Sequence, residues 1–124
     1  QFDDGAELML YRLRQKDGSA GSWSHGSYID ARGAVRALSA GDFRLTPGRV
    51  WTSSRSGARY PLEWRVEVPS LGINLAVRPR LDGQEVHGAS GVSPTYWEGA
   101  VEATGTRTGR GYLELTGYGQ PLSW

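Results

Sequence analysis

The stretch of residues 95–118, TYWEGAVEATGTRTGRGYLELTGY, decides the fold class of this chain. Apolar and polar side chains alternate on both sides of a glycine-studded segment, residues 105–111. The apolar positions are Trp97, Gly99, Val101 and Ala103 before the turn and Leu113 and Leu115 after it. A period of two places one face of a strand on a core and the other toward water. The stretch therefore predicts a long antiparallel hairpin.

Shorter alternating segments, bounded by glycine, proline or aspartate, fill the rest of the chain. In the cleanest one, residues 59–68, every second side chain is apolar. Two Asp-Gly pairs, Asp17-Gly18 and Asp82-Gly83, favour tight hairpin turns because both central residues take positive φ. Residues 34–45 are less regular, and we interpret them as a strand, a break and a second short strand. The whole pattern predicts an all-β fold of about nine or ten strands with little helix, an antiparallel up-and-down barrel.

The composition limits the class of protein. With 124 residues, the chain is expected to form a single domain, residues 1–124. A net charge of +1, with scattered arginines and one lysine, argues against a nucleic-acid partner. No cysteine is present, which excludes a disulfide framework. No apolar run approaches the roughly 20 residues that span a bilayer, so no transmembrane segment is expected. Because the sequence starts at Gln1 rather than methionine, we expect a piece of a longer protein.

Four stretches together resemble a known family. They are DDGAELMLYRLR at 3–14, SGARYPLEW at 56–64, TYWEGAV at 95–101 and GYLELTGY at 111–118. They are similar to the carboxy-terminal half of the two-domain, lipocalin-like AttH-like proteins, also labelled predicted secreted hydrolases, whose relatives include carotenoid 1,2-hydratases, kievitone hydratases and some fungal cyclases. The resemblance implies a lipocalin-like (calycin-type) β-barrel, a second lipocalin-like domain preceding it as a partner, and a periplasmic or secreted location. A hydrolase is not expected, because the sequence contains no Gly-x-Ser-x-Gly elbow.

Large aromatic side chains are the candidates to line a cavity for a hydrophobic small molecule. They are Trp23, Trp51, Tyr60, Trp64, Tyr96, Trp97 and Tyr112. The alternative is that these side chains simply fill the interior, as they do in small barrels. Tyr96 and Trp97 are adjacent and point to opposite faces, so only one of them lines a cavity.

Two residues are candidate catalytic groups. His25 is a possible general base or proton donor, because a histidine titrates near neutral pH. Glu98 is a possible acid, since a buried carboxylic acid with a raised pKa is able to protonate an alkene; the alternative is a surface charge. The second histidine, His87, lies in a glycine-rich loop and is expected at a barrel mouth. The histidines have no zinc-type spacing, so no metal is expected, and no nucleotide or phosphate motif indicates a cofactor.

Three functions remain open from the sequence. The first is binding of a hydrophobic small molecule, by this barrel alone or as the supporting half of a two-barrel site. The second is a cofactor-independent lyase or isomerase that acts on an apolar isoprenoid or polyketide-type substrate together with a preceding barrel, as the hydratases in the resemblance imply. The third is a filled domain that docks the preceding one.

Overall fold

The computed structural model describes residues 1–19, 21, 23–88 and 94–119, which form eleven strands and two short 3-10 helices. The strands are β1 (Glu7–Tyr11), β2 (His25–Ile29), β3 (Val35–Ser39), β4 (Arg44–Pro47), β5 (Val50–Thr52), β6 (Arg59–Pro61), β7 (Trp64–Val68), β8 (Ile73–Pro79), β9 (Glu85–Val86), β10 (Tyr96–Gly105) and β11 (Gly109–Leu115). The 3-10 helices are η1 (Ala40–Asp42) and η2 (Pro69–Leu71). Within the described ranges, neither helix has the length or hydrophobicity to cross a membrane.

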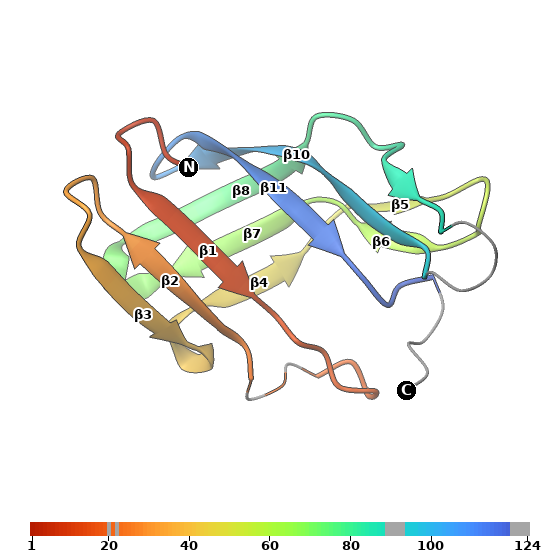
Figure 1. Cartoon of the computed structure of the whole chain (residues 1–124), viewed down its shortest axis with the longest axis horizontal. Coiled ribbons are helices and arrows are strands. Elements are labelled where there is room, and N and C mark those ends of the chain that lie inside the picture. Colours follow the sequence, from red (N-terminus) through yellow and green to blue (C-terminus); the bar gives the residue numbers. More distant parts are fainter. Residues whose placement is uncertain (20, 22, 89–93, 120–124) are drawn as a thin grey trace.

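The strands pair antiparallel in three sheets (Figure 1). One contains β1, β2 and β3; the largest follows the order β11-β10-β8-β7-β4, with β9 also on β10; β5 and β6 form a hairpin of their own. The predicted all-β antiparallel fold with little helix is confirmed. The sheets are not closed into one barrel, however, because η1 separates β3 from β4 and β1 does not pair with β11. Alternation reveals which face of a strand is buried, but it does not reveal which edges pair.

The predicted hairpin at 95–118 is present as β10 and β11. Trp97 faces Leu115 and Val101 faces Gly111 in this ladder. The apolar face is buried as predicted, with Trp97 fully inaccessible to solvent. Gly105 ends β10 at φ +136, and a Cβ there would collide with the backbone oxygen of Asn74. Only glycine fits this position without strain.

The predicted strand at 59–68 is divided in two. β6 pairs with β5, whereas β7 pairs with β4 and β8. Leu62 and Glu63, between the two strands, bond instead to the turn before β5, where Leu62 N–H donates to Arg49 O and Gly48 N–H donates to Glu63 O. The apolar face nevertheless stays on one side, so the alternation predicted burial correctly and missed the change of sheet.

The Asp82-Gly83 pair does not join a hairpin, so that prediction was wrong. β8 and β9, the strands on either side of it, both pair with β10 at different places along its length. The segment between them bulges out, and Trp97 Nε1 donates to the backbone oxygen of Asp82 in it, at 2.7 Å. This segment leads into β9, and β9 contains the central residue of the candidate site.

The interior is packed by two hydrophobic clusters. The first lies between the β1-β2-β3 sheet and strands β4, β7 and β8, and its buried members are Phe2, Ala6, Tyr28, Leu38, Val66, Val68, Ile73 and Leu75. The second contains Ala58, Tyr60, Leu62, Trp97 and Leu115, with Trp51, Trp64, Leu113 and Tyr118 packed against it. The second cluster is largely aromatic and supports the β5-β6 hairpin beside β9.

Candidate functional site

A buried carboxylate, Glu85 of β9, is the centre of the candidate site. Its side chain is 3% exposed. Three hydroxyl groups donate to it: Ser53 Oγ to Oε1 at 2.6 Å, Ser56 Oγ to Oε2 at 2.5 Å and Tyr60 OH to Oε2 at 2.8 Å. The three donors come from the β5-β6 hairpin, far from Glu85 in sequence. A buried charge is tolerated when it is hydrogen-bonded in this way.

His87 completes the cluster. Its Nε2 lies 2.9 Å from Glu85 Oε1, and its side chain is 22% exposed. Glu85 and His87 are two residues apart in a locally extended segment, so both side chains point to the same side. A carboxylate that holds one ring nitrogen of a histidine fixes the ring and leaves the other nitrogen to act on a substrate. The pair therefore places a titratable group at the edge of a buried site.

The charge states follow from the surroundings. Burial raises the pKa of Glu85, but the hydrogen bonds from Ser53, Ser56 and Tyr60 and the neighbouring His87 lower it by more, so the net pKa lies below the ordinary value. Burial, and then the hydrogen bond and charge of Glu85, raise the pKa of Tyr60 well above its ordinary value. At neutral pH Glu85 is thus an ionised acceptor and Tyr60 a protonated donor.

The turn between β5 and β6 builds the donor side of the site. Ser53 Oγ accepts the backbone N–H groups of Arg55 and Ser56, and Ser56 Oγ accepts that of Ala58. Gly57 takes φ +76, which permits the tight reversal. Serine side chains commonly stabilise turns by such local bonds. Here the same two hydroxyls also reach Glu85, so the turn and the site are one structure.

Three of the sequence-predicted ligand residues lie around this cluster. Tyr60 is fully buried, its ring stacks on Trp51 at 6.2 Å between centroids, and it packs against Tyr118 at 6.0 Å. Trp97 lies directly across from Glu85 in the β9–β10 ladder. On the far side, the guanidinium of Arg14 lies 3.6 Å from the centroid of the Tyr118 ring. The structure thus brings Trp51, Tyr60 and Trp97 together.

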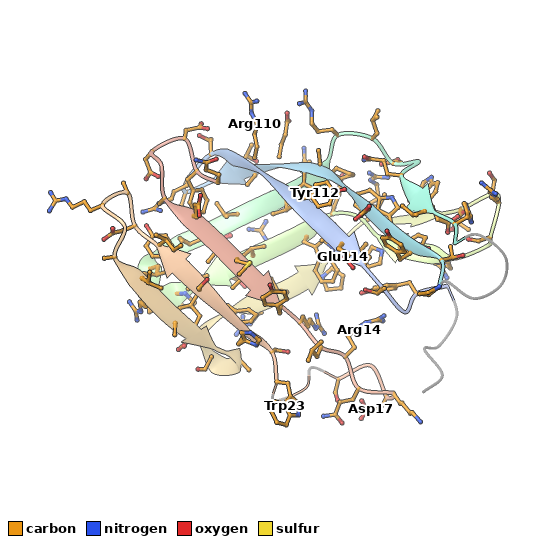
Figure 2. The ribbon with its side chains drawn as sticks, in the orientation of Figure 1. Arg14, Asp17, Trp23, Arg110, Tyr112 and Glu114 are labelled. Atoms are coloured by element: carbon orange, nitrogen blue, oxygen red, sulfur yellow. The ribbon has the colours of Figure 1, made fainter. Side chains whose placement is uncertain are left out.

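The other predicted residues lie elsewhere. Trp64 is half-buried and donates through Nε1 to Pro61 O at 2.8 Å. Tyr96 and Glu98 are half-buried on the opposite face of β10 from Trp97, with the Tyr96 hydroxyl 3.5 Å from Glu98 Oε1. Tyr112 is exposed on β11 (Figure 2).

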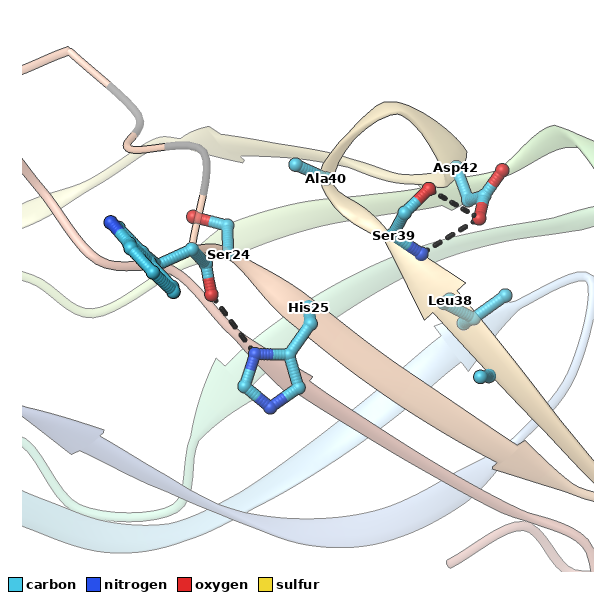
Figure 3. A pocket seen from close by; sticks show the side chains of 8 residues that line it. Ser24, His25, Leu38, Ser39, Ala40 and Asp42 are labelled. Carbon is cyan, nitrogen blue, oxygen red and sulfur yellow. Dashed lines mark hydrogen bonds between the residues drawn. The ribbon is translucent and has the colours of Figure 1, made fainter.

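His25 and Trp23 border a separate, open groove of about 420 Å³ (Figure 3). His25 Nδ1 lies 2.9 Å from the backbone oxygen of Trp23, and its ring lies 5.1 Å from that of Tyr11. Trp23 is 78% exposed. Asp42, across the groove, accepts from the backbone and hydroxyl of Ser39. The groove therefore holds polar groups whose hydrogen bonds are local and solvent-exposed.

Sequence reasoning placed His87 at a barrel mouth but missed Glu85, Ser53 and Ser56. The Glu-x-His spacing of residues 85 and 87 was the available signal, because it places both side chains on one face of an extended segment. The serines gave no comparable signal, since they look like ordinary turn residues. Among the described residues, no group of three or more histidine, aspartate or glutamate side chains could hold a metal ion.

The fold is that of an all-β domain of the lipocalin-like class. The AttH-like family model matches residues 1–118, and the chain therefore belongs to the AttH-like family. A solved structure of a candidate AttH from Nitrosomonas europaea is 37% identical, with a TM-score of 0.86 over 96% of this chain. The kievitone hydratase of Nectria haematococca is 17% identical, with a TM-score of 0.68 over 94% of this chain, and shows the same fold.

The chain spans 36% of the length of each of these solved structures. No curated protein sequence matches it significantly.

Proposed function

We propose that this domain binds an apolar small molecule, and that His87 transfers a proton to it while Glu85 holds the imidazole in position. The observation that carries the proposal is the 2.9 Å contact between a buried carboxylate and a partly exposed imidazole. Such a pair is suited to moving a proton, because the carboxylate orients the ring through one nitrogen and leaves the other nitrogen to exchange a proton. Half-buried Trp51, at the edge of the buried aromatic cluster that contains Tyr60 and Trp97, favours an apolar ligand.

The chemistry proposed is addition of water to a carbon–carbon double bond, or its reverse, without a cofactor. In the forward direction, protonated His87 gives its proton to one alkene carbon and a water molecule bonds to the other. The water then loses a proton, which returns to His87, so that one H and one OH are added in total. The kievitone hydratase that shares this fold is, by its name, an enzyme of a related reaction. Glu85 stays ionised and is a positioning residue.

The test uses farnesol as an apolar alkene probe in D₂O. Native mass spectrometry measures binding to the domain, and product analysis measures deuterium incorporated at carbon. We expect both for the natural sequence, and we expect H87Q to retain binding while incorporation falls at least about 100-fold, the usual range for loss of an acid–base group. H25Q is the matched control and is expected to retain both. Unchanged incorporation in H87Q, or no complex with farnesol, would contradict the proposal.

A second proposal concerns the outer face of the β1-β2-β3 sheet. This face exposes several large apolar side chains: Met9, Tyr11, Leu13, Trp23 and Val35. Exposed apolar patches of this kind are typical of interaction surfaces. We propose that a preceding lipocalin-like domain of the same protein covers this face, together with the groove lined by His25. Reduced solvent accessibility of Trp23 to acrylamide quenching in the two-domain protein would support it.

A further inference from the structure

The inward face of β1 continues beyond the strand with two arginines. Within β1, Leu8 and Leu10 pack against the first hydrophobic cluster. Leu13, between the two arginines, is exposed on the outer side. Because side chains alternate along an extended segment, Arg12 and Arg14 point to the same side as Leu8 and Leu10. Two positive charges therefore lie where the pattern of the strand would place apolar side chains.

The guanidinium group of Arg12 reaches across the interior to the other sheet. Its Nη1 donates to Leu45 O, on β4, at 3.1 Å. Its Nε is buried and has no hydrogen-bond acceptor, and it is the only buried side-chain nitrogen or oxygen in this condition within the described part of the chain. A buried N–H group without an acceptor is rare in folded proteins and costs free energy. This atom therefore indicates that the surroundings of Arg12 suit a further acceptor.

Arg14 lies at the same end of the interior. Its guanidinium carbon is 3.6 Å from the centroid of the Tyr118 ring, and its Nη2 donates to Thr116 O at 3.3 Å. Figure 2 shows Arg14 between the segment that follows β1 and the end of β11. Burial raises the pKa of Tyr118, and the charges of Arg14 and then of Arg12 oppose this effect. Because a charge shifts a pKa only at short range, both guanidinium groups lie near the Tyr118 hydroxyl group.

Neither Arg12 nor Arg14 forms an ion pair with a carboxylate of the described residues. Other arginines do form such pairs: Arg44 with Glu67, Arg49 with Glu63 and Asp82, Arg80 with Glu102, and Arg107 with Asp4. Arg12 and Arg14 use backbone oxygens and an aromatic ring. These partners satisfy single N–H groups but neutralise neither charge, so an anion bound here would be stabilised by both.

The geometry of Arg12 suits a carboxylate. Nη1 bonds to Leu45, whereas Nε belongs to the opposite edge of the group, which it forms with Nη2. The two parallel N–H groups of this edge match the two oxygens of a carboxylate in a bidentate pair. Arg14, two residues further along, supplies a second charge about 7 Å away along an extended backbone. The two side chains together are therefore suited to an anionic group rather than to a neutral one.

We propose that Arg12 and Arg14 form a binding site for the carboxylate group of a small molecule, at the end of the interior beside Tyr118. The Nε–Nη2 edge of Arg12 donates to the carboxylate, and Arg14 adds its charge. Tyr118 packs against Tyr60 of the second cluster at 6.0 Å between ring centroids, so an apolar part of the same molecule would meet aromatic rings. The inference does not depend on the proton transfer proposed for His87, because His87 takes no part in the site.

The experiment observes the arginine Nε–H groups directly. Proton–nitrogen NMR of the ¹⁵N-labelled chain is followed during titration with sodium benzoate at constant ionic strength. Benzamide has nearly the same shape without the charge, and sodium sulfate is an anion of different geometry. We expect benzoate to shift the Nε–H signals of Arg12 and Arg14 in a saturable way. We expect no shift with benzamide and clearly weaker binding of sulfate.

Two substitutions of exposed arginines complete the test. Arg14→Gln is expected to weaken benzoate binding at least about 10-fold, because it removes one of the two charges. Arg110→Gln is the matched control, since Arg110 is also exposed and lies at the opposite end of β11 (Figure 2). It is expected to leave the affinity for benzoate unchanged. The backbone amide spectrum of each variant verifies that the fold is retained.

Three results would overturn the proposal. The first is that benzoate produces no saturable shift at Arg12 and Arg14. The second is that benzamide or sulfate binds there as tightly as benzoate, because the site would then not select a carboxylate. The third is that Arg14→Gln and Arg110→Gln have equal effects on the affinity, because the attraction would then come from the net charge of the protein.

Discussion

Two regions of this domain contain the same three kinds of side chain and use them differently. Each has a tryptophan, a histidine and a carboxylate. The first region has Trp97, His87 and Glu85, and the second has Trp23, His25 and Asp42. In the first, the tryptophan is fully inaccessible and the carboxylate is 3% exposed. In the second, the tryptophan is 78% exposed and borders an open groove.

The difference lies in the range of the contacts. The three hydroxyl groups that donate to Glu85 are 25 to 32 residues away in sequence. His25, by contrast, bonds to a backbone oxygen two residues away, and Asp42 bonds to a serine three residues away. Long-range contacts bring several segments around one group and exclude water from it. Local contacts satisfy the same atoms and leave them exposed. Residue type alone therefore does not distinguish a buried reactive group from a surface one.

The largest expected difference in stability is between substitutions of the two tryptophans. Trp97→Ala removes a fully buried side chain and the hydrogen bond from Nε1 to Asp82 O, so we expect a loss of about 3–5 kcal/mol in the free energy of unfolding. Trp23→Ala removes an exposed side chain and is expected to change the free energy of unfolding by less than about 0.5 kcal/mol. Urea unfolding of both variants measures this. Similar losses in the two would mean that the regions do not differ as described.

The next largest expected difference in stability is between substitutions of the two carboxylates. Glu85→Ala leaves His87 and the hydroxyl groups of Ser53, Ser56 and Tyr60 without their shared acceptor, and we expect a loss of about 3 kcal/mol in the free energy of unfolding. Asp42→Ala removes only local bonds to Ser39 at an exposed turn, so the loss is expected to be clearly smaller. Thermal unfolding of the two variants provides the comparison. A larger loss for Asp42→Ala would reverse it.

The smallest effect concerns pH. The folded-state pKa of Glu85 lies below its ordinary value of 4.5, so its ionised form stabilises the fold above that pH, and this stability is lost as the pH falls below 4.5 through the folded-state pKa. Glu85→Gln should therefore reduce the dependence of stability on pH in this range. Urea unfolding from pH 3 to pH 6 tests the prediction, and a slope equal to that of the natural sequence would contradict it.

Much of the fold could be predicted from local patterns. The hairpin of β10 and β11 and the break between β3 and β4 follow from alternation and from glycine positions, because both depend on neighbouring residues. The division of 59–68 into β6 and β7 could not be predicted in this way. The alternating face continues through the break, and only the partners change from β5 to β4 and β8.

The sequence by itself determined the all-β class, the buried faces and the resemblance to the AttH-like family. These are properties of periodicity and of residue order, both of which are local. Only the tertiary structure decided that Ser53, Ser56 and Tyr60 surround Glu85, and that His25 lies on an exposed face while His87 contacts a buried carboxylate. Those facts depend on which strands pair and in which register, and many distant contacts act together to set that register.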